Sequence, residues 1–322
     1  MSTERDISLL LGTGGGFFAA AQSPTPATTT GFLSILPKYG IKDIDTAAVY
    51  PGGKSGRSEE LLGTIKASSK FTIDTKIMVT GGHGPGAGMG DLSRESVLKS
   101  WKTSCERLGV KRVRTLYCHR PDDGTPLVET AAVFDELYKQ GAFEHWGVSN
   151  YPIATLQDLL KVCEENNFIK PTVYQGMYNV LCRHAEKSLF PILQEHKITY
   201  NVYSPTAGGL FASTPSSRYQ EHNPGAANWI GMYKGSPKLD EGIDKVRKIA
   251  RENGIEAMEL ALRWAVHDSP LRMGDGVILG ARNEEQLVQN LEWIEKGRLP
   301  EGVKEILDEI WDDVEEVAPG RV

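Results

Sequence analysis

Short runs of β-forming residues alternate with amphipathic helical stretches along almost the whole of this chain of 322 residues. Such alternation is typical of a parallel sheet whose strands are joined by helical crossovers. Seven strand runs can be recognised, and a further N-terminal run, Ile7–Leu11, brings the number to the eight of a closed barrel. The seven runs are Ile41–Thr46, Thr72–Lys76, Val113–His119, His145–Val148, Thr172–Gln175, Thr199–Tyr203 and Gly276–Leu279.

The stretches between these runs have recognisable helix ends. Thr125 and Pro126 are residue types preferred at an N-cap and at the first helical position. Gly141 stands where a helix is expected to end on a left-handed glycine. Asn283 and Gln286 have the spacing of a capping box, which predicts a helix that starts just after a strand.

The sequence therefore predicts an α/β protein: a (β/α)8 TIM barrel, built as a single domain over residues 1–322, with long loops at its C-terminal rim. No linker rich in Pro or Ser divides the chain. The alternation alone also fits an open, doubly wound sheet. The polar segment Phe211–Leu239 predicts a long loop, which is either a lid or binding loop or a tolerated surface insertion.

Composition narrows the classes of function. The formal net charge is −6 without a run of like charges, so we expect no nucleic-acid partner and no membrane surface. The four cysteines form no CxxC pair and no His/Cys cluster has zinc spacing, which favours a reducing compartment and no metal site. The N-terminus lacks the apolar core of a signal peptide, and no apolar run approaches the ~20 residues needed to span a bilayer. We therefore expect a cytoplasmic protein.

Side chains able to carry chemistry stand at the ends of three consecutive strand runs. Asp45 lies at the end of one run and Tyr50 follows it, Lys76 ends the next, and His119 ends the one after. Each has an ordinary structural alternative, such as an Asp that caps a helix, a solvated Lys or a His satisfied in the core. Because the carboxyl ends of barrel strands converge on one rim, we expect the four side chains to meet there.

Together these four residue types suit carbonyl reduction. Hydride transfer to a carbonyl needs a proton donor for the developing alkoxide. A tyrosine with its usual pKa of about 10 donates poorly near neutrality, and a neighbouring ammonium lowers that pKa by favouring the phenolate. The carboxylate of Asp45 would keep Lys76 charged and in place, and His119 would orient the carbonyl oxygen.

The chain resembles the aldo-keto reductase superfamily, and most closely the subgroup that includes the aflatoxin-aldehyde and succinic-semialdehyde reductases. The resemblance implies a (β/α)8 barrel, NADPH as cofactor, and Asp45, Tyr50, Lys76 and His119 as a catalytic tetrad with Tyr50 as proton donor. The implied reaction is reduction of a small aldehyde or ketone to an alcohol. Relatives in this subgroup are often dimers, so a homodimer is one expectation. The resembling stretches, in the family's order from about residue 40 to about residue 292, are DIDTAAVYPGGKSGRSEELLG, LYCHRPDDGTPLVET, WGVSNY, PTVYQGMYN, YSPTAGGL and GDGVILGARNEEQLVQNL.

The resemblance also assigns residues to the nicotinamide end of the cofactor. Ser149, Asn150 and Gln175 would hydrogen-bond the carboxamide, since hydroxyl and amide groups supply donors and acceptors. Tyr203 would stack on the nicotinamide ring, and its alternative is a core aromatic. Glycine permits close approach to the pyrophosphate, and the backbone that would wrap it includes Ser204, Gly208 and Leu210.

The adenosine end falls on a strand-to-helix junction that begins at Gly280. A helix N-terminus attracts phosphate through its free N–H groups and its dipole. Arg282 adds a fork-shaped cation suited to a 2′-phosphate, which favours NADP over NAD. Gln286 and Asn290, one turn apart, would face the adenosine. The alternative is an ordinary capped surface helix.

Departures from the family pattern concern the mouth of the site. Glycine is unusually frequent after the first strand run, after Tyr50 and after Lys76, in LLLGTGGGFF, PGGKSGR and GGHGPGAGMG. Thr206 stands where leucine is common. These changes bear on substrate preference, and the sequence does not name the substrate. Arg218 and Arg321 are candidates for holding a substrate carboxylate.

The glycines also permit a different dinucleotide-binding interpretation. Gly14–Ala19 matches the G-x-G-x-x-A fingerprint of a Rossmann domain, but SPTPATTTG interrupts the helix that should follow. Tyr50 and Lys54 imitate a Y-x-x-x-K pair, which needs a helix that the intervening proline and glycines disfavour.

Two further alternatives keep the barrel and change the function. Some proteins that resemble this family bind NADPH as regulatory subunits of ion channels, with little turnover, and fold alone does not separate binding from catalysis. A metal-dependent hydrolase would need more ligands than His119, Asp122 and Asp123 supply.

Overall fold

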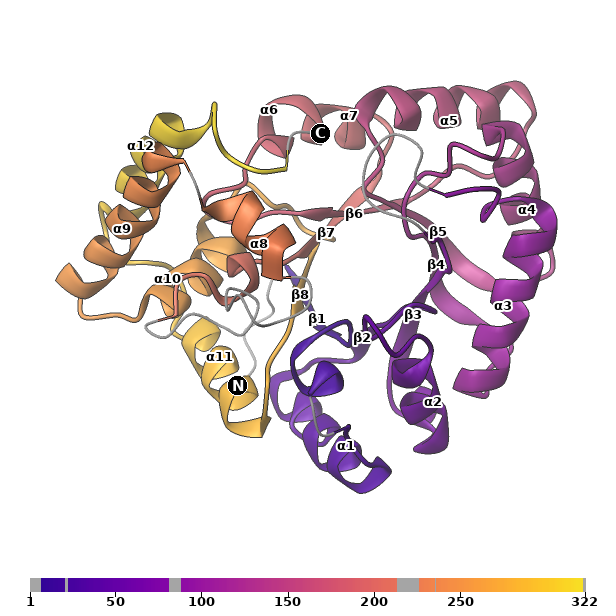
Figure 1. Ribbon diagram of the computed structural model, residues 1–322, viewed down its shortest axis with the longest axis horizontal. Coiled ribbons are helices and arrows are strands. Elements are labelled where there is room, and N and C mark those ends of the chain that lie inside the picture. Colours follow the sequence, from indigo (N-terminus) through magenta and orange to yellow (C-terminus); the bar gives the residue numbers. More distant parts are fainter. Residues whose placement is uncertain (1–6, 21–22, 81–87, 213–225, 235, 321–322) are drawn as a thin grey trace.

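The computed structural model describes residues 7–20, 23–80, 88–212, 226–234 and 236–320. Its eight strands run parallel to their neighbours and close into a barrel in chain order (Figure 1). This confirms the predicted (β/α)8 barrel and excludes the open sheet, because β1 also pairs with β8. The strands are β1 Ser8–Gly12, β2 Asp43–Asp45, β3 Thr72–Ile77, β4 Val113–Cys118, β5 Phe143–Ser149, β6 Val173–Met177, β7 Thr199–Tyr203 and β8 Gly276–Leu279.

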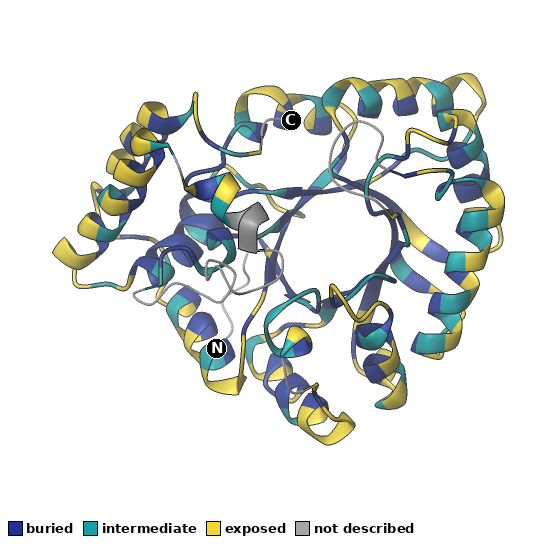
Figure 2. Cartoon of the chain, in the orientation of Figure 1, coloured by how far each residue is buried: buried dark blue, intermediate teal, exposed yellow. Residues whose placement is uncertain are grey.

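Helices surround the barrel and cover its outer face (Figure 1). Apart from α8, whose burial is only partly described, the helices turn their buried residues toward the interior of the molecule and their exposed residues outward (Figure 2), as expected of amphipathic helices. The α-helices are α1 Pro26–Leu33, α2 Arg57–Thr64, α3 Arg94–Leu108, α4 Leu127–Lys139, α5 Ile153–Glu165, α6 Ala185–Ser188, α7 Phe190–Glu195, α8 Ala226–Tyr233, α9 Pro237–Glu252, α10 Ala257–Arg263, α11 Glu284–Glu295 and α12 Val303–Val314.

The segment Phe211–Leu239 is not the continuous loop that its polarity predicts. Residues 226–233 form α8, and α9 already begins at Pro237, in the first turn where proline is tolerated. Tyr233 is fully buried, and its hydroxyl accepts a 2.9 Å hydrogen bond from the Asn179 side chain. The short run AANWIGMY contains enough apolar residues to pack against the rest of the protein, although the segment as a whole is polar.

The predicted cap at Thr125 and the predicted capping box of Asn283 and Gln286 need correction, and the predicted helix end at Gly141 is confirmed. Thr125 does not cap α4; Pro126 is the N-cap, and the Thr125 hydroxyl donates to Asp122 instead. Asn283 does cap α11, accepting from the N–H of Gln286 at 2.8 Å. The Gln286 side chain, however, accepts from the N–H of Arg282 rather than from that of the cap, so the capping box is not reciprocal. Gly141 is left-handed, as predicted.

Alternation along β3 decides which side chains reach the interior of the barrel. The Thr75 hydroxyl faces α2, where it donates a 2.7 Å hydrogen bond to Glu59. Its neighbours Asp74 and Lys76 therefore point inward. Asp74 is held by an ion pair with the Arg114 guanidinium. Lys76 lies two residues closer to the C-terminal rim, where its side chain faces the candidate site.

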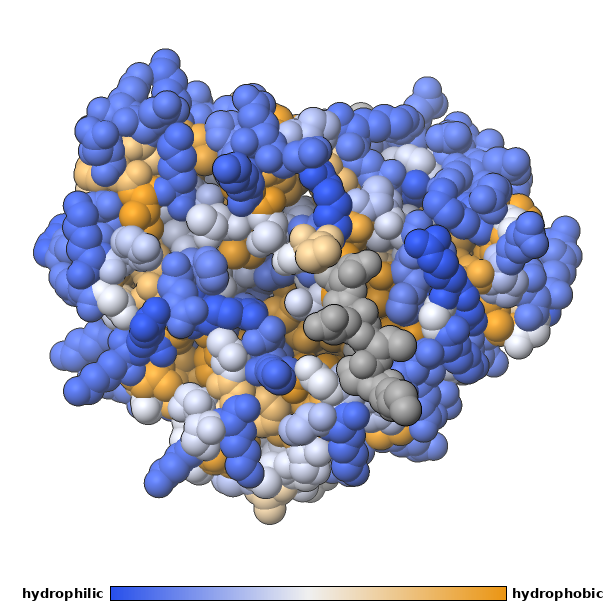
Figure 3. Space-filling model, turned by 180° about the vertical axis from the view of Figure 1, so that it is seen from behind, coloured by the Kyte–Doolittle hydropathy of each residue, from blue (hydrophilic) through white to orange (hydrophobic). Residues whose placement is uncertain are grey.

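Hydrophilic residues dominate the face opposite to the view of Figure 1, with smaller apolar areas between them (Figure 3). Among the residues that the structure describes, no helix has the length and apolar character required to cross a membrane.

Candidate active site

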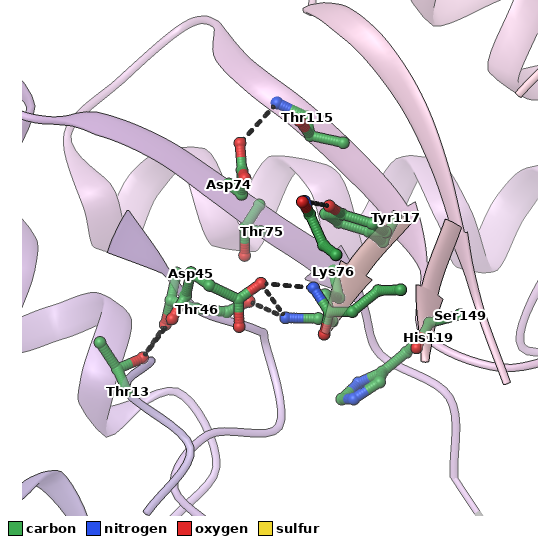
Figure 4. A network of polar contacts seen from close by, with 12 residues as sticks. Thr13, Asp45, Thr46, Asp74, Thr75, Lys76, Thr115, Tyr117, His119 and Ser149 are labelled. Atoms are coloured by element: carbon green, nitrogen blue, oxygen red, sulfur yellow. Dashed lines mark hydrogen bonds and ion pairs between the residues drawn. The ribbon is translucent and has the colours of Figure 1, made fainter. Parts of the chain in front are cut away.

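A buried ion pair lies at the centre of the site. Lys76 Nζ donates to Asp45 Oδ1 at 2.6 Å and to the Thr46 carbonyl at 2.9 Å (Figure 4). The Lys76 side chain is 0% exposed and that of Asp45 is 3% exposed. Burying a lone charge is strongly unfavourable, so each of these groups depends on the other. The pairing follows from the neighbouring ends of β2 and β3.

The ring of Tyr50 lies beside this ion pair. Its centroid is 5.0 Å from Lys76 Nζ, close enough for an ammonium to act on a phenol. The Tyr50 hydroxyl is 3.4 Å from His119 Nε2, and the two rings meet edge to face. The backbone of Tyr50 is tied down because its carbonyl accepts from the N–H of Ser58 at 3.1 Å. The structure thus brings together all four side chains predicted at the strand ends.

Gln175 belongs to the same network. From the middle of β6, its Nε2 donates to Asp45 Oδ1 at 2.8 Å. One carboxylate oxygen therefore accepts from both Lys76 and Gln175. The predicted role of Gln175 concerned only the carboxamide of a cofactor, and nothing in the local sequence indicated this bond to a residue 130 positions away.

Ser149, Asn150 and Tyr203 form a second connected group at the ends of β5 and β7. Asn150 is left-handed, with a φ of 58°, and its amide nitrogen donates to the His119 carbonyl and to the Ser149 hydroxyl. The Tyr203 hydroxyl donates to Asn150 Oδ1 at 2.8 Å. Burial raises the pKa of the Tyr203 phenol well above its usual range. Tyr203 therefore stays neutral near pH 7 and presents an uncharged ring.

The chain that follows β7 has four residues with a left-handed backbone, Ser204, Ala207, Gly208 and Gly209. Ser204 has a φ of 56° and Gly208 a φ of 67°. The Ser204 carbonyl accepts from the Asn179 side chain at 3.2 Å, and the carbonyl of Leu210 accepts from Arg247 at 2.8 Å. These bonds fix the curve of a backbone segment that could follow a pyrophosphate.

The junction between β8 and α11 offers groups suited to the other end of a dinucleotide. Arg282, beside Gly280, is exposed, and its guanidinium makes no ion pair with any residue in the described part of the chain. Asn290 is 2% exposed, and its amide nitrogen donates to the Gly280 carbonyl at 3.4 Å. Within the described ranges its Oδ1 is buried without a hydrogen-bond partner. A buried acceptor without a donor fits the amino group of an adenine.

Sequence reasoning missed a network of buried hydroxyl groups that links Thr13, Thr46 and Ser58, the residue whose N–H binds the Tyr50 carbonyl. The Thr13 hydroxyl donates to that of Thr46 at 2.8 Å (Figure 4). The Ser58 hydroxyl donates to the Thr13 carbonyl at 2.9 Å. All three residues are fully buried. Serine and threonine are common on helices and strands, and no local pattern distinguishes these from ordinary ones.

Arg120, directly after His119, is a further residue that sequence reasoning missed. Partial burial lowers the pKa of its guanidinium, and the phenols of Tyr50 and Tyr203 oppose that shift. Its charge therefore acts on both aromatic residues of the site. Its place after a strand-end His is the one local signal that could have drawn attention to it.

Arg218 and Arg321 lie outside the described residues. Across the described ranges, no group of three or more His, Cys, Asp or Glu side chains could hold a metal ion.

Comparison with known proteins adds independent findings. The model of the aldo/keto reductase family matches residues 9–312. The chain is 36% identical to the oxidoreductase sirO of Leptosphaeria maculans over 89% of this chain and 87% of that protein. It is 34% identical to aflatoxin B1 aldehyde reductase member 2 of Rattus norvegicus, over 92% of this chain and 82% of that protein. It is also 34% identical to human aldo-keto reductase family 7 member A3, over 92% of both proteins.

Proposed function

This chain is an oxidoreductase that belongs to the aldo/keto reductase family, and we propose that it reduces an aldehyde or ketone to an alcohol with NADPH, with Tyr50 as the proton donor. The observation that carries the proposal is the position of Tyr50. Its hydroxyl is 3.4 Å from His119 Nε2, and its ring adjoins the Lys76–Asp45 ion pair.

The proton is proposed to leave the Tyr50 hydroxyl for the carbonyl oxygen of the substrate. The ammonium of Lys76 makes this easier because it stabilises the phenolate that remains. Asp45 holds that ammonium in place through a 2.6 Å contact between two almost fully buried side chains. His119, beside the Tyr50 hydroxyl, orients the carbonyl oxygen and stabilises the negative charge that develops on it.

NADPH, when bound, supplies the hydride. Ser149 and the free face of the Gln175 amide are proposed to hold the carboxamide, and the neutral ring of Tyr203 to stack on the nicotinamide. The left-handed backbone at Ser204 and Gly208 would follow the pyrophosphate.

The preference for NADPH over NADH is proposed to depend on Arg282. A guanidinium binds a phosphate through two parallel hydrogen bonds, and that of Arg282 is exposed at the start of α11. The first turn of α11 also contains Glu284 and Glu285, which repel an anion. A cation at position 282 is therefore needed to make this end attractive to a 2′-phosphate. Asn290 supplies a buried acceptor for the adenine.

One experiment separates the proposed reductase from a regulatory barrel that binds NADPH with little turnover. NADPH affinity is measured by fluorescence titration, and oxidation of NADPH at 340 nm is followed with 4-nitrobenzaldehyde. Multiple turnovers within minutes are expected of a reductase, for which kcat values of about 1 s⁻¹ or more are usual. Tight NADPH binding with turnover slower than one per hour would contradict the proposal.

We further propose that the protein works in the reducing environment of the cytoplasm. All four cysteines are free thiols, and three of them are buried. Burial raises the pKa of Cys118 to about 12 and that of Cys105 to about 11, so both stay protonated and slow to oxidise. A homodimer is proposed only by analogy with relatives, and light scattering of the purified protein tests it.

A further inference from the structure

The glycine-rich loop that follows β1 supplies no side chain to the proposed tetrad or cofactor site. Gly14, in this loop, lies directly against the catalytic ring proposed above. A Cβ atom placed on Gly14 would lie 2.9 Å from Cζ of Tyr50, and 3.0 and 3.1 Å from its Cε2 and Cε1 atoms. Carbon atoms in contact normally stay about 3.5 to 4.0 Å apart. The space between this backbone and the ring therefore admits a hydrogen atom and nothing larger.

One flank of the loop is held by the hydrogen-bond network of Thr13, Thr46 and Ser58. The N–H of Thr13 donates to the Asp45 carbonyl at 2.9 Å, and its hydroxyl donates to Thr46. The Thr13 carbonyl in turn accepts from Ser58. All of these partners are buried, so retreat of the loop would leave several polar groups unsatisfied.

The loop is also held on its other side, next to the proposed cofactor loop. The N–H of Phe17 donates to the Ala281 carbonyl at 2.7 Å. Gly16 has a φ of 58°, and a Cβ there would lie 2.2 Å from the same carbonyl oxygen. Contacts on both flanks thus fix Gly14, and an added methyl group would displace the ring rather than the backbone.

We propose that Gly14 is a positioning residue: its missing side chain is what allows the Tyr50 hydroxyl to sit beside His119 and next to Lys76. The clash falls on Cζ, the ring atom that carries the hydroxyl. Any side chain at position 14 displaces the proton donor from its place beside His119. The inference rests on the proposed role of Tyr50 as proton donor.

Gly14→Ala is the direct test. The φ of Gly14 lies outside the left-handed region, so alanine adds a methyl group without backbone strain, and folded protein is expected. We expect kcat to fall about 10-fold or more, because small misplacements of reacting groups cost up to ~10²-fold. The Kd for NADPH and the melting temperature should change little. Gly52→Ala is the matched control: position 52 belongs to the Tyr50 loop, has an ordinary φ, and has nothing within 4 Å of an added Cβ.

A double-mutant cycle separates positioning from a general structural effect. In the Tyr50→Phe background the donor hydroxyl is absent, so Gly14→Ala should cause no further loss in the rate of a single turnover. An equal loss in both backgrounds, or wild-type kcat in Gly14→Ala, would overturn the proposal about Gly14. Neither result touches the proposed function, which fails separately if Tyr50→Phe itself turns over normally. If Gly14→Ala did not fold, the crystal structure of the wild-type protein with NADPH would decide the matter. A Tyr50 ring far from Gly14 in that structure would overturn the proposal.

Discussion

Gln175 donates a 2.8 Å hydrogen bond to Oδ1 of Asp45, the same oxygen that binds Lys76. Gln175, which is proposed to hold the cofactor, is thus bonded directly to the carboxylate that pairs with Lys76. In the proposed mechanism, binding of the carboxamide and the effect of Lys76 on the Tyr50 phenol are therefore linked through one side chain.

Gln175→Leu should impair both functions. The change removes a hydrogen bond to a charged, buried group, an effect of about 1.5–3 kcal/mol, and leaves Asp45 less well compensated. We expect a weaker Kd for NADPH and also a kcat that is several-fold lower at saturating NADPH. Stopped-flow kinetics and fluorescence titration measure the two values. Gln157→Leu, on the exposed side of α5, is the control. A change in Kd alone would show that the bond to Asp45 has no catalytic consequence.

Tyr50→Phe should lower kcat by ~10²-fold or more, as expected for loss of a general acid. Only the hydroxyl is removed, so the ring still fills its place against Gly14, and NADPH should bind with its usual affinity. Steady-state turnover of 4-nitrobenzaldehyde and NADPH titration are the measurements. Near-normal turnover in this variant would exclude Tyr50 as the donor.

Lys76→Met should reduce kcat by a similar factor, because an ammonium next to Tyr50 is replaced by a neutral side chain of similar size. It also leaves the Asp45 carboxylate buried without its cation, so we expect the free energy of unfolding to fall by about 3–5 kcal/mol. Denaturation in urea measures this loss. Asp45→Asn combined with Lys76→Met should restore much of the stability without restoring turnover. Lys161→Met, at a position 73% exposed, is the control for replacing a lysine. Retained activity in Lys76→Met would argue against tuning of the phenol by this ammonium.

Arg282→Ala should weaken NADPH binding far more than NADH binding. The guanidinium meets only the 2′-phosphate in the proposed arrangement, and a charge-assisted bidentate contact is worth about 1.5–3 kcal/mol. The Kd for NADPH should therefore rise by about 10- to 100-fold, while that for NADH stays nearly constant. Equal weakening of both cofactors would remove the assignment. Arg251→Ala, on the exposed side of α9, controls for a general loss of positive charge.

Much of the fold could be predicted because strand propensity and hydrophobicity are local. β7 and β8 have the predicted bounds, and the other six strands begin and end within two residues of the predictions. The wrong prediction of a helix cap arose because a side chain can have more than one possible hydrogen-bond partner. Thr125 has the composition of a cap, yet its hydroxyl bonds Asp122, which already organises the neighbouring loop. No pattern of helix ends contains that information.

The candidate site was predictable to the extent that strand ends converge in a barrel. Asp45, Lys76 and His119 reach one rim because alternation points them inward from adjacent strands. The contacts between distant segments were not predictable. Gly14 contacts Tyr50 and Gln175 contacts Asp45 because of the path that the loops take and the size of the barrel. No local sequence pattern encodes either of these. The glycine run even permitted a Rossmann interpretation, because its own sequence does not reveal that Gly14 lies against Tyr50.

Asp122 gives the last prediction, which concerns stability rather than turnover. Asp122 is 6% exposed, and its carboxylate accepts four hydrogen bonds, from the N–H groups of Gly90, Leu92 and Gly124 and from the Thr125 hydroxyl. Burial on its own raises the pKa of this carboxyl, but the hydrogen bonds outweigh burial and hold the pKa below its usual value. A carboxyl with a depressed pKa stabilises the fold above the unfolded pKa of about 3.9, and that contribution is lost as the pH falls through the folded pKa.

Asp122→Asn should therefore destabilise the protein by about 1–3 kcal/mol at pH 7, because the new amide group faces donors instead of accepting from them. The difference from the wild type should shrink as the pH falls below about 4, where Asp122 of the unfolded wild-type chain becomes protonated. It should be lost fully only when the pH falls through the lower pKa of the folded carboxyl. Urea denaturation of both proteins at pH 7, 5 and 3.5 measures the difference in the free energy of unfolding. A difference that stays constant over this range would show that the charge of Asp122 contributes nothing and that only its shape is needed.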